Sequence, residues 1–120
     1  MLALRLVLTE APDTLVFDEV DAGIGGEAAL AVGRSLAALG SRHQVLVVTH
    51  LPQVAAFADR QIAVGKSEVA GRTVAHAELV EGDARTRELS RMLSGMSDSA
   101  TARRHARELL ESARAARRAQ

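Results

Sequence analysis

The sequence predicts an α/β fold with parallel strands, followed by a β-hairpin and a closing pair of helices. Two short apolar runs without alternation, at 14–17 and 44–48, are typical of strands buried on both faces. A helical pattern at 26–39, ended by Gly40, lies between them, which predicts a β-α-β unit with a right-handed crossover. With 120 residues, 48% of them hydrophobic, we expect one domain over 1–120 and no second one.

The first ten residues predict a helix that is buried on several sides. Leucine and valine cover most of the circumference of residues 1–10. No N-cap residue precedes this helix to accept hydrogen bonds from its first N–H groups. We therefore expect that a further segment precedes it in the intact protein. Pro12 and Asp13 end the helix.

Turn and cap residues predict the later elements. Gly71 and Arg72 lie between two alternating runs and predict the turn of a hairpin. Gly95 separates two helical patterns, and Ser97 or Ser99 caps the second of them. The predicted elements are a short helix at 51–58, a strand at 60–66, a returning strand at 72–80, and helices at 84–93 and 99–116.

Composition excludes several classes of site. The chain has no cysteine, and its four histidines do not fall at paired zinc spacing, so any metal must be held by oxygen atoms. No signal peptide and no apolar stretch long enough to span a membrane occur. We therefore expect a cytoplasmic protein with no membrane partner, and surface positions for His43, His76 and His105.

Charge is distributed unevenly although the net charge is zero. Residues 1–33 hold six acids and one arginine, whereas residues 101–120 hold six arginines and two glutamates. The aromatic content of 2% argues against a module that stacks bases, so DNA contact would go through phosphates. Because Glu108 and Glu111 are interspersed among the C-terminal arginines, we favour a solvated helix face over a DNA site.

Acidic residues follow the first predicted strand directly, in the stretch TLVFDEVD. The carboxyl ends of parallel strands form the ligand edge of such a sheet. There Asp18 could hold Mg²⁺, and Glu19 could activate a water for attack on a phosphoryl group. An isolated Asp-Glu pair could equally be solvated loop residues, but the four apolar residues before it favour the functional interpretation. The stretch resembles a Walker B motif of ABC and SMC ATPases. The resemblance implies that Asp18 binds Mg²⁺ through water and that Glu19 is the catalytic base.

A glycine-rich loop, VDAGIGG at 20–26, follows in the position of the D-loop of that class, which crosses a dimer interface. Glycines allow close backbone approach and positive φ, so Gly23, Gly25 and Gly26 are candidate binding residues. The usual pattern has an aspartate about where Gly25 stands, and the sequence leaves open whether Asp21 takes its place. The form DEVDAGIGG resembles the RecN branch of the SMC-like ATPases.

A dinucleotide fingerprint is the competing interpretation of this loop, because Gly23, Gly25 and Ala28 satisfy G-x-G-x-x-G/A. In that fold the first glycine follows the strand directly. Here three acids intervene and would repel a pyrophosphate, and no acid ends the next strand to bind a ribose. Saturable NAD binding by the chain would support this weaker hypothesis.

The second strand runs into His50 in the stretch VVTHLPQVA. A lone histidine is more often structural, but one at the end of a neighbouring strand would share the ligand edge with Asp18. The stretch resembles the switch histidine loop of ABC-type ATPases in its RecN form, which implies that His50 contacts the γ-phosphate.

The resemblance of these three motifs to those of SMC-like ATPases implies part of a P-loop NTPase: the C-terminal lobe of an ATPase head that uses ATP and Mg²⁺. G-x-x-x-x-G-K-[ST] does not occur in the sequence, nor does the serine-glycine-glycine signature, so the chain alone should not turn over ATP. The resemblance implies an N-terminal half of the same head as partner, a head-to-head homodimer, and recombinational repair of DNA double-strand breaks at the bacterial nucleoid. The alternative is a non-catalytic module that pairs with another head or docks on DNA.

Overall fold

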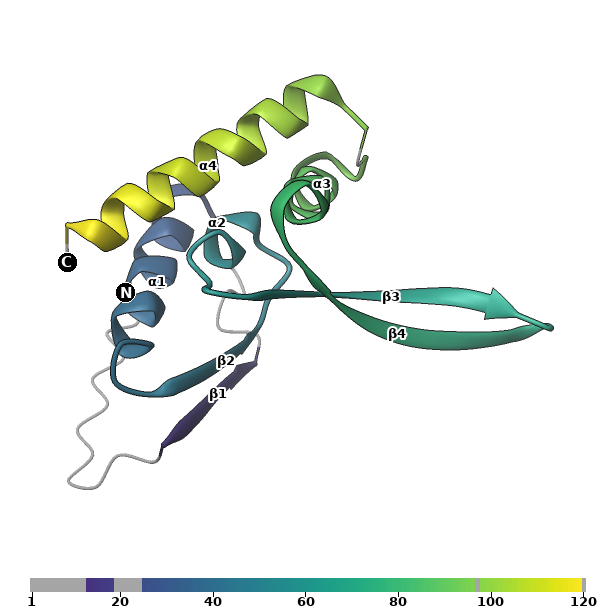
Figure 1. Ribbon diagram of the computed structural model, residues 1–120, viewed down its shortest axis with the longest axis horizontal. Coiled ribbons are helices and arrows are strands. Elements are labelled where there is room, and N and C mark those ends of the chain that lie inside the picture. Colours follow the sequence, from purple (N-terminus) through teal and green to yellow (C-terminus); the bar gives the residue numbers. More distant parts are fainter. Residues whose placement is uncertain (1–12, 19–24, 97, 120) are drawn as a thin grey trace.

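The computed structural model describes residues 13–18, 25–96 and 98–119. The helix predicted at 1–10 and the loop residues 19–24 lie outside the described residues. Figure 1 shows the arrangement of the elements. In chain order they are β1 (Thr14–Asp18), α1 (Gly26–Leu39), β2 (Gln44–Val48), α2 (Pro52–Ala55), β3 (Gln61–Val69), β4 (Arg72–Val80), α3 (Gly82–Ser94) and α4 (Ala100–Arg118).

The predicted β-α-β unit is present. Strands β1 and β2 pair in parallel, with Thr14 opposite Gln44 and Asp18 opposite Val48, and α1 connects them. A side-chain hydrogen bond of 2.9 Å from Thr14 Oγ1 to Gln44 Oε1 joins the first residues of the two strands. Gly40 ends α1, although in a right-handed helical conformation (φ −64°) rather than the left-handed one that favours glycine at a helix end.

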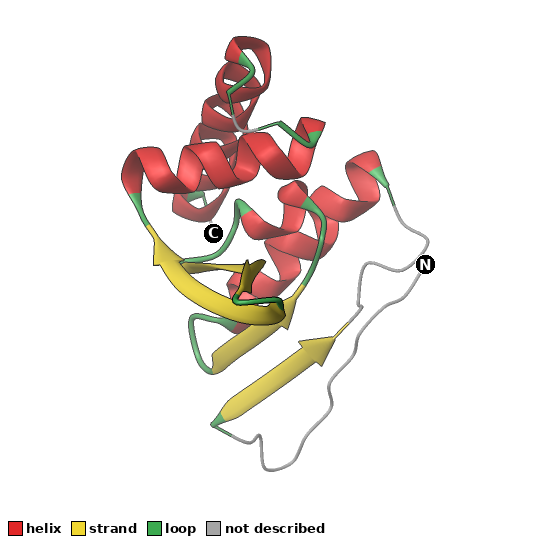
Figure 2. Cartoon of the chain, turned by 90° about the vertical axis from the view of Figure 1, so that its right-hand side faces the viewer, coloured by secondary structure: helices red, strands yellow, loops and turns green. Residues whose placement is uncertain are grey.

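The prediction that these two strands are buried on both faces is wrong for the described structure. Leu15 is only 8% exposed, whereas Val16, Leu46 and Val48 are 67%, 50% and 61% exposed. Figure 2 shows the reason: among the described residues, the helices gather on one side of these strands. The apolar residues of the other face, Val16, Leu46 and Val48, are called the uncovered sheet face below.

Strands β3 and β4 form a separate antiparallel sheet, a hairpin that projects from the body of the molecule (Figure 1). Its turn residues are Ala70 and Gly71, both with positive φ (52° and 75°), as expected for the two-residue turn that matches strand twist. The turn therefore lies one residue earlier in the chain than the predicted pair Gly71 and Arg72. The ring of His76 lies against Gly65, its partner across the hairpin, where an added Cβ would stand 2.7 Å from Nε2.

The closing helices pack as a core with α2. Leu89 of α3 and Ala106 of α4 are fully buried, and Phe57 lies beside them in the same cluster. Ser99 caps α4 by accepting a hydrogen bond of 3.3 Å from the Ala102 N–H, which confirms one of the two predicted caps. In the described part of the chain, no helix combines the length and apolar character needed to cross a bilayer.

Candidate functional site

The candidate site is the edge at which β1 and β2 both end. Because the strands are parallel and Asp18 stands opposite Val48, the residues that follow both strands leave the sheet at the same edge. His50 comes two residues after Val48. The structure thus confirms the neighbouring strands on which the prediction depended, and it brings Asp18 and the histidine loop to one edge.

Asp18 is the last residue of β1 and is exposed to solvent. It lies on the same side of the strand as Val16, so its carboxylate belongs to the uncovered sheet face. An exposed carboxylate at a sheet edge is an oxygen donor of the kind that Mg²⁺ accepts. Among residues 13–18, 25–96 and 98–119, no three acidic or histidine side chains gather as a metal site. The other predicted acids, Glu19 and Asp21, lie outside the described residues.

The end of the glycine loop leads into α1. Gly25 is the N-cap residue in an extended conformation, and Gly26 begins the helix with φ +50°, which glycine adopts without strain. A Cβ added to either residue would meet nothing within 4 Å, so this part of the backbone is open to approach. Gly23 lies outside the described residues.

The dinucleotide interpretation loses support at Ala28. The third position of that fingerprint permits close packing of the helix against the strand. Ala28 lies in the first turn of α1 and is exposed, whereas its neighbour Ala29 is fully buried, so the buried side of the helix start is not at the fingerprint position. The described end of the loop therefore does not resemble a nucleotide-binding turn of that fold.

His50 lies in the short connection between β2 and α2 and is exposed. Thr49 shapes this connection, because its Oγ1 accepts a hydrogen bond of 3.0 Å from the Leu51 N–H. Leu51 is the N-cap of α2, and Pro52 occupies the first helical turn, where its fixed φ suits a helix start. The other histidines lie elsewhere: His76 and His105 are exposed as predicted, whereas His43 is partly buried.

Comparison with known proteins gives this arrangement a family. No protein-family model matches the sequence. However, the chain is 57% identical over 119 residues to DNA repair protein RecN of Streptomyces coelicolor, which covers 98% of this chain and 21% of that protein. It is 54% identical over 110 residues to DNA repair protein RecN of Deinococcus radiodurans, which covers 92% of this chain and 19% of the relative. The chain belongs to the RecN family. It spans about a fifth of the length of these RecN relatives.

Sequence analysis missed one polar residue of this RecN segment. Arg85 of α3 is half-buried, and its guanidinium group donates hydrogen bonds toward the end of α2. Burial lowers the pKa of Arg85 below its ordinary value, and the charges of Arg114 and Arg117 lower it further, whereas Asp59 acts in the opposite direction. An arginine inside an amphipathic helix carries no sequence signal that separates it from its solvated neighbours.

A half-open cleft in the described part of the RecN segment lies away from the candidate edge. It encloses about 320 Å³ between α4 and the junction of β4 with α3. Neither Asp18 nor His50 lines it, and the charges that do so are mixed. They are the cations Arg60, Arg85, Arg107 and Arg114 and the acids Asp59, Glu81, Asp83 and Glu111.

Proposed function

We propose that this RecN segment contributes half of an ATP site to a DNA repair protein and does not turn over ATP alone. The observation that carries the proposal is the parallel pairing of β1 and β2, in which Asp18 and the loop that holds His50 leave the sheet at one edge. This is the edge at which ligands bind in open α/β sheets.

In the proposed site each residue has a separate chemical role. Asp18 would hold Mg²⁺, which when bound would neutralise charge on the phosphates. Glu19 accepts a proton from the attacking water. His50 contacts the γ-phosphate and helps to keep it in the geometry needed for hydrolysis. The order Asp18, Glu19, glycine loop and His50 is the one that resembles SMC-like ATPases.

The other half of the site must come from elsewhere, because the sequence holds no phosphate-binding loop. Two facts support a covering segment from the N-terminal half of the same head. The uncovered sheet face exposes three large aliphatic side chains, and soluble monomers rarely leave such apolar surface contiguous. The RecN relatives are about five times as long as this chain, so they have ample sequence to cover it.

The loop at 20–26 is proposed to face a second head in a head-to-head dimer bound to ATP. The open surroundings of Gly25 and the positive φ of Gly26 support a close approach of another backbone. Asp21 and Gly23 belong to the same proposed contact. DNA repair, which the names of the relatives state, is proposed here as the role of the assembled protein, with DNA as its partner.

A second candidate function is a non-catalytic module that pairs with another head or docks on DNA. The absent phosphate-binding loop favours it for this chain taken by itself. The two functions differ in what happens after assembly, because a module of this kind would associate without gaining ATP hydrolysis.

Substitution of Glu19 tests the catalytic proposal in a RecN-length protein that carries this segment. Glu19→Gln removes the proton acceptor, and we expect a fall in turnover of roughly 100-fold or more while ATP-bound dimers accumulate. Unchanged turnover would exclude the proposed role of Glu19.

Substitution of Asp18 tests the metal ligand in the same protein. Asp18→Asn should lower turnover by a factor on the order of 100, with partial recovery at high Mg²⁺ concentration. Asp13→Asn is the matched control, because Asp13 precedes β1 and lies at the opposite end of that strand. Equal turnover of the two variants would show that Asp18 does not act on the metal.

A further inference from the structure

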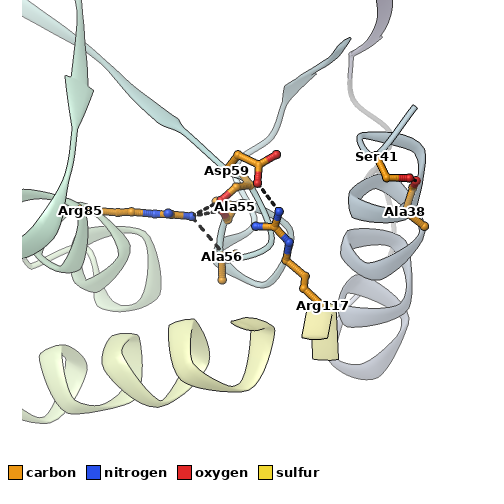
Figure 3. A network of polar contacts seen from close by, with 8 residues as sticks. Ala38, Ser41, Ala55, Ala56, Asp59, Arg85 and Arg117 are labelled. Atoms are coloured by element: carbon orange, nitrogen blue, oxygen red, sulfur yellow. Dashed lines mark hydrogen bonds and ion pairs between the residues drawn. The ribbon is translucent and has the colours of Figure 1, made fainter. Parts of the chain in front are cut away.

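The turn that follows α2 is held by arginines from the closing helices. Residues 55–59 form the end of α2 and the bend into β3, and they begin five residues after His50. Figure 3 shows Arg85 and Arg117 approaching this turn from two different helices. Arg85 belongs to no motif that the sequence analysis identified, whereas Arg117 is one of the six arginines of residues 101–120.

Arg85 makes most of these contacts. Its Nη2 donates to the carbonyl oxygens of Ala58 at 2.8 Å, Ala55 at 3.1 Å and Ala56 at 3.4 Å. Its Nε donates to Gln61 Oε1 at 3.3 Å. The last carbonyl groups of a helix have no partners within the helix. The Ala55 carbonyl already accepts a hydrogen bond of 3.1 Å from the Ala58 N–H, and Arg85 adds charged hydrogen bonds, the stronger kind, to it and to the carbonyl groups of the turn that follows.

Two further contacts hold the same turn. Arg117 of α4 forms an ion pair with Asp59, the residue that ends the turn. Phe57 lies against Gly33 of α1 so closely that a Cβ added to Gly33 would stand 2.6 Å from the ring carbon Cδ2. Contacts with α1, α3 and α4 therefore hold the turn in place. The end of β2, which precedes His50, is held by the sheet instead.

A helix as short as α2 does not determine its own direction. One turn of helix is marginal in water, because nucleation costs more than a single hydrogen bond returns. The position of α2, and with it the connection that holds His50, must come from tertiary contacts. The hydrogen bonds of Arg85 are the polar contacts that reach the end of this helix from α3.

We propose that Arg85 is a positioning residue for His50: by holding the carbonyl end of α2 it sets where the preceding histidine lies at the sheet edge. The proposal rests on the proposed function in one respect only: it assumes that His50 contacts the γ-phosphate. The positioning itself is a property of the described residues. Arginine suits this role because its planar fork directs several donors at once, which the single ammonium group of lysine does not.

Histidine ring signals in the NMR spectrum of this chain test the positioning directly. In Arg85→Met we expect the His50 ring signals to shift and broaden, while those of His76 on the hairpin and His105 on α4 stay in place. Arg85→Lys keeps the charge without the fork and should give a smaller change. Arg87→Met, at an exposed position of the same helix, is the matched control and should change nothing.

A merely structural role of Arg85 predicts a different pattern. Ala102→Gly lowers the helix propensity of α4 and destabilises the chain, and Ala102 lies outside the core cluster that contains Ala55, Ala56 and Phe57. If Arg85→Met lowers the melting temperature but shifts the His50 ring signals no more than Ala102→Gly does, the proposal is overturned. If Arg85→Met does not fold, the comparison of Arg85→Lys with wild type decides the same question.

Turnover in a RecN-length protein provides the functional measurement. A misplaced His50 should lower kcat of Arg85→Lys by roughly 10- to 100-fold with little change in KM, since small displacements of a reacting group are costly. Equal loss in Arg87→Lys would overturn the proposal. Wild-type protein without any ATP turnover would instead refute the proposed function, and the NMR result would still decide whether Arg85 positions His50.

Discussion

The helical layer and the strand layer of this chain differ in how completely each buries its apolar residues. In the helical layer, Leu89 and Ala106 are fully buried, and Ala113 is 2% exposed. In the strand layer, Val16 and Val48 are more than half exposed, although they belong to the most apolar stretches of the sequence. The residues proposed to carry the chemistry lie in the poorly covered layer. This difference indicates that the helices contribute most of the buried core of the described residues, and it agrees with the proposal that another segment packs on the uncovered sheet face.

The largest expected effect is on the helical core. Leu89→Ala removes a fully buried side chain and should lower the free energy of unfolding by about 2–5 kcal/mol. Leu46→Ala, on the uncovered sheet face, should cost less than about 1 kcal/mol in the chain alone. Chemical denaturation of both variants measures this difference. Similar losses would break the distinction between the two layers.

A substitution on the uncovered sheet face should have a large effect on assembly with the N-terminal half, although it has little effect on the stability of the chain alone. Leu46→Glu places a charge where the N-terminal half is proposed to pack, and burial of an unpaired carboxylate is costly. We expect its affinity for that half to fall by roughly 100-fold, which corresponds to about 3 kcal/mol. Val69→Glu, at the exposed end of β3, is the control and should bind normally. Normal binding by both variants would show that this face is not the contact.

The contact between α1 and α2 should tolerate no added methyl group. Gly33→Ala gains helix propensity, but its Cβ would meet the buried ring of Phe57 at 2.6 Å and the Gln53 carbonyl oxygen at 3.1 Å. We expect a net loss of about 1–3 kcal/mol in unfolding free energy. Ser35→Ala, exposed on the same helix, should be neutral or slightly stabilising. A stabilised Gly33→Ala would show that the two helices are not packed so closely.

The smallest expected effect is a gain at the hairpin turn. Ala70 adopts φ +52°, a left-handed conformation that is strained for a residue with a Cβ. Ala70→Gly relieves that strain and should raise the free energy of unfolding by about 0.5–1 kcal/mol. Ala70→Val should be destabilising by thermal denaturation, and an increase in its melting temperature would contradict the left-handed turn.

Most of the element positions could be predicted from sequence because local signals determine them. The apolar runs and their spacing predicted β1 and β2, and residue type limited the cap of α4 to Ser97 or Ser99, of which the structure selects Ser99. The burial of these strands could not be predicted, because a run such as TLVF is equally apolar whether one face or both faces of the sheet are covered. The exposure of Val16 depends on which segments are present to cover it.

The candidate site shows the same limit. Position in the chain predicted that Asp18 and His50 follow neighbouring strands, and the parallel register confirms that relation. Arg85 could not be found in this way. Its contacts with the end of α2 arise from the packing of α3, about thirty residues further along the chain. No local pattern distinguishes it from exposed Arg87 two residues later.

The most direct test of the proposed half-site is ATP hydrolysis by this chain alone, by a separately expressed N-terminal half of a RecN protein, and by their mixture. We predict no turnover by either part and Mg²⁺-dependent turnover by the mixture. An inactive mixture, in which the N-terminal half is folded and bound to this chain, would contradict the half-site and support the non-catalytic module instead.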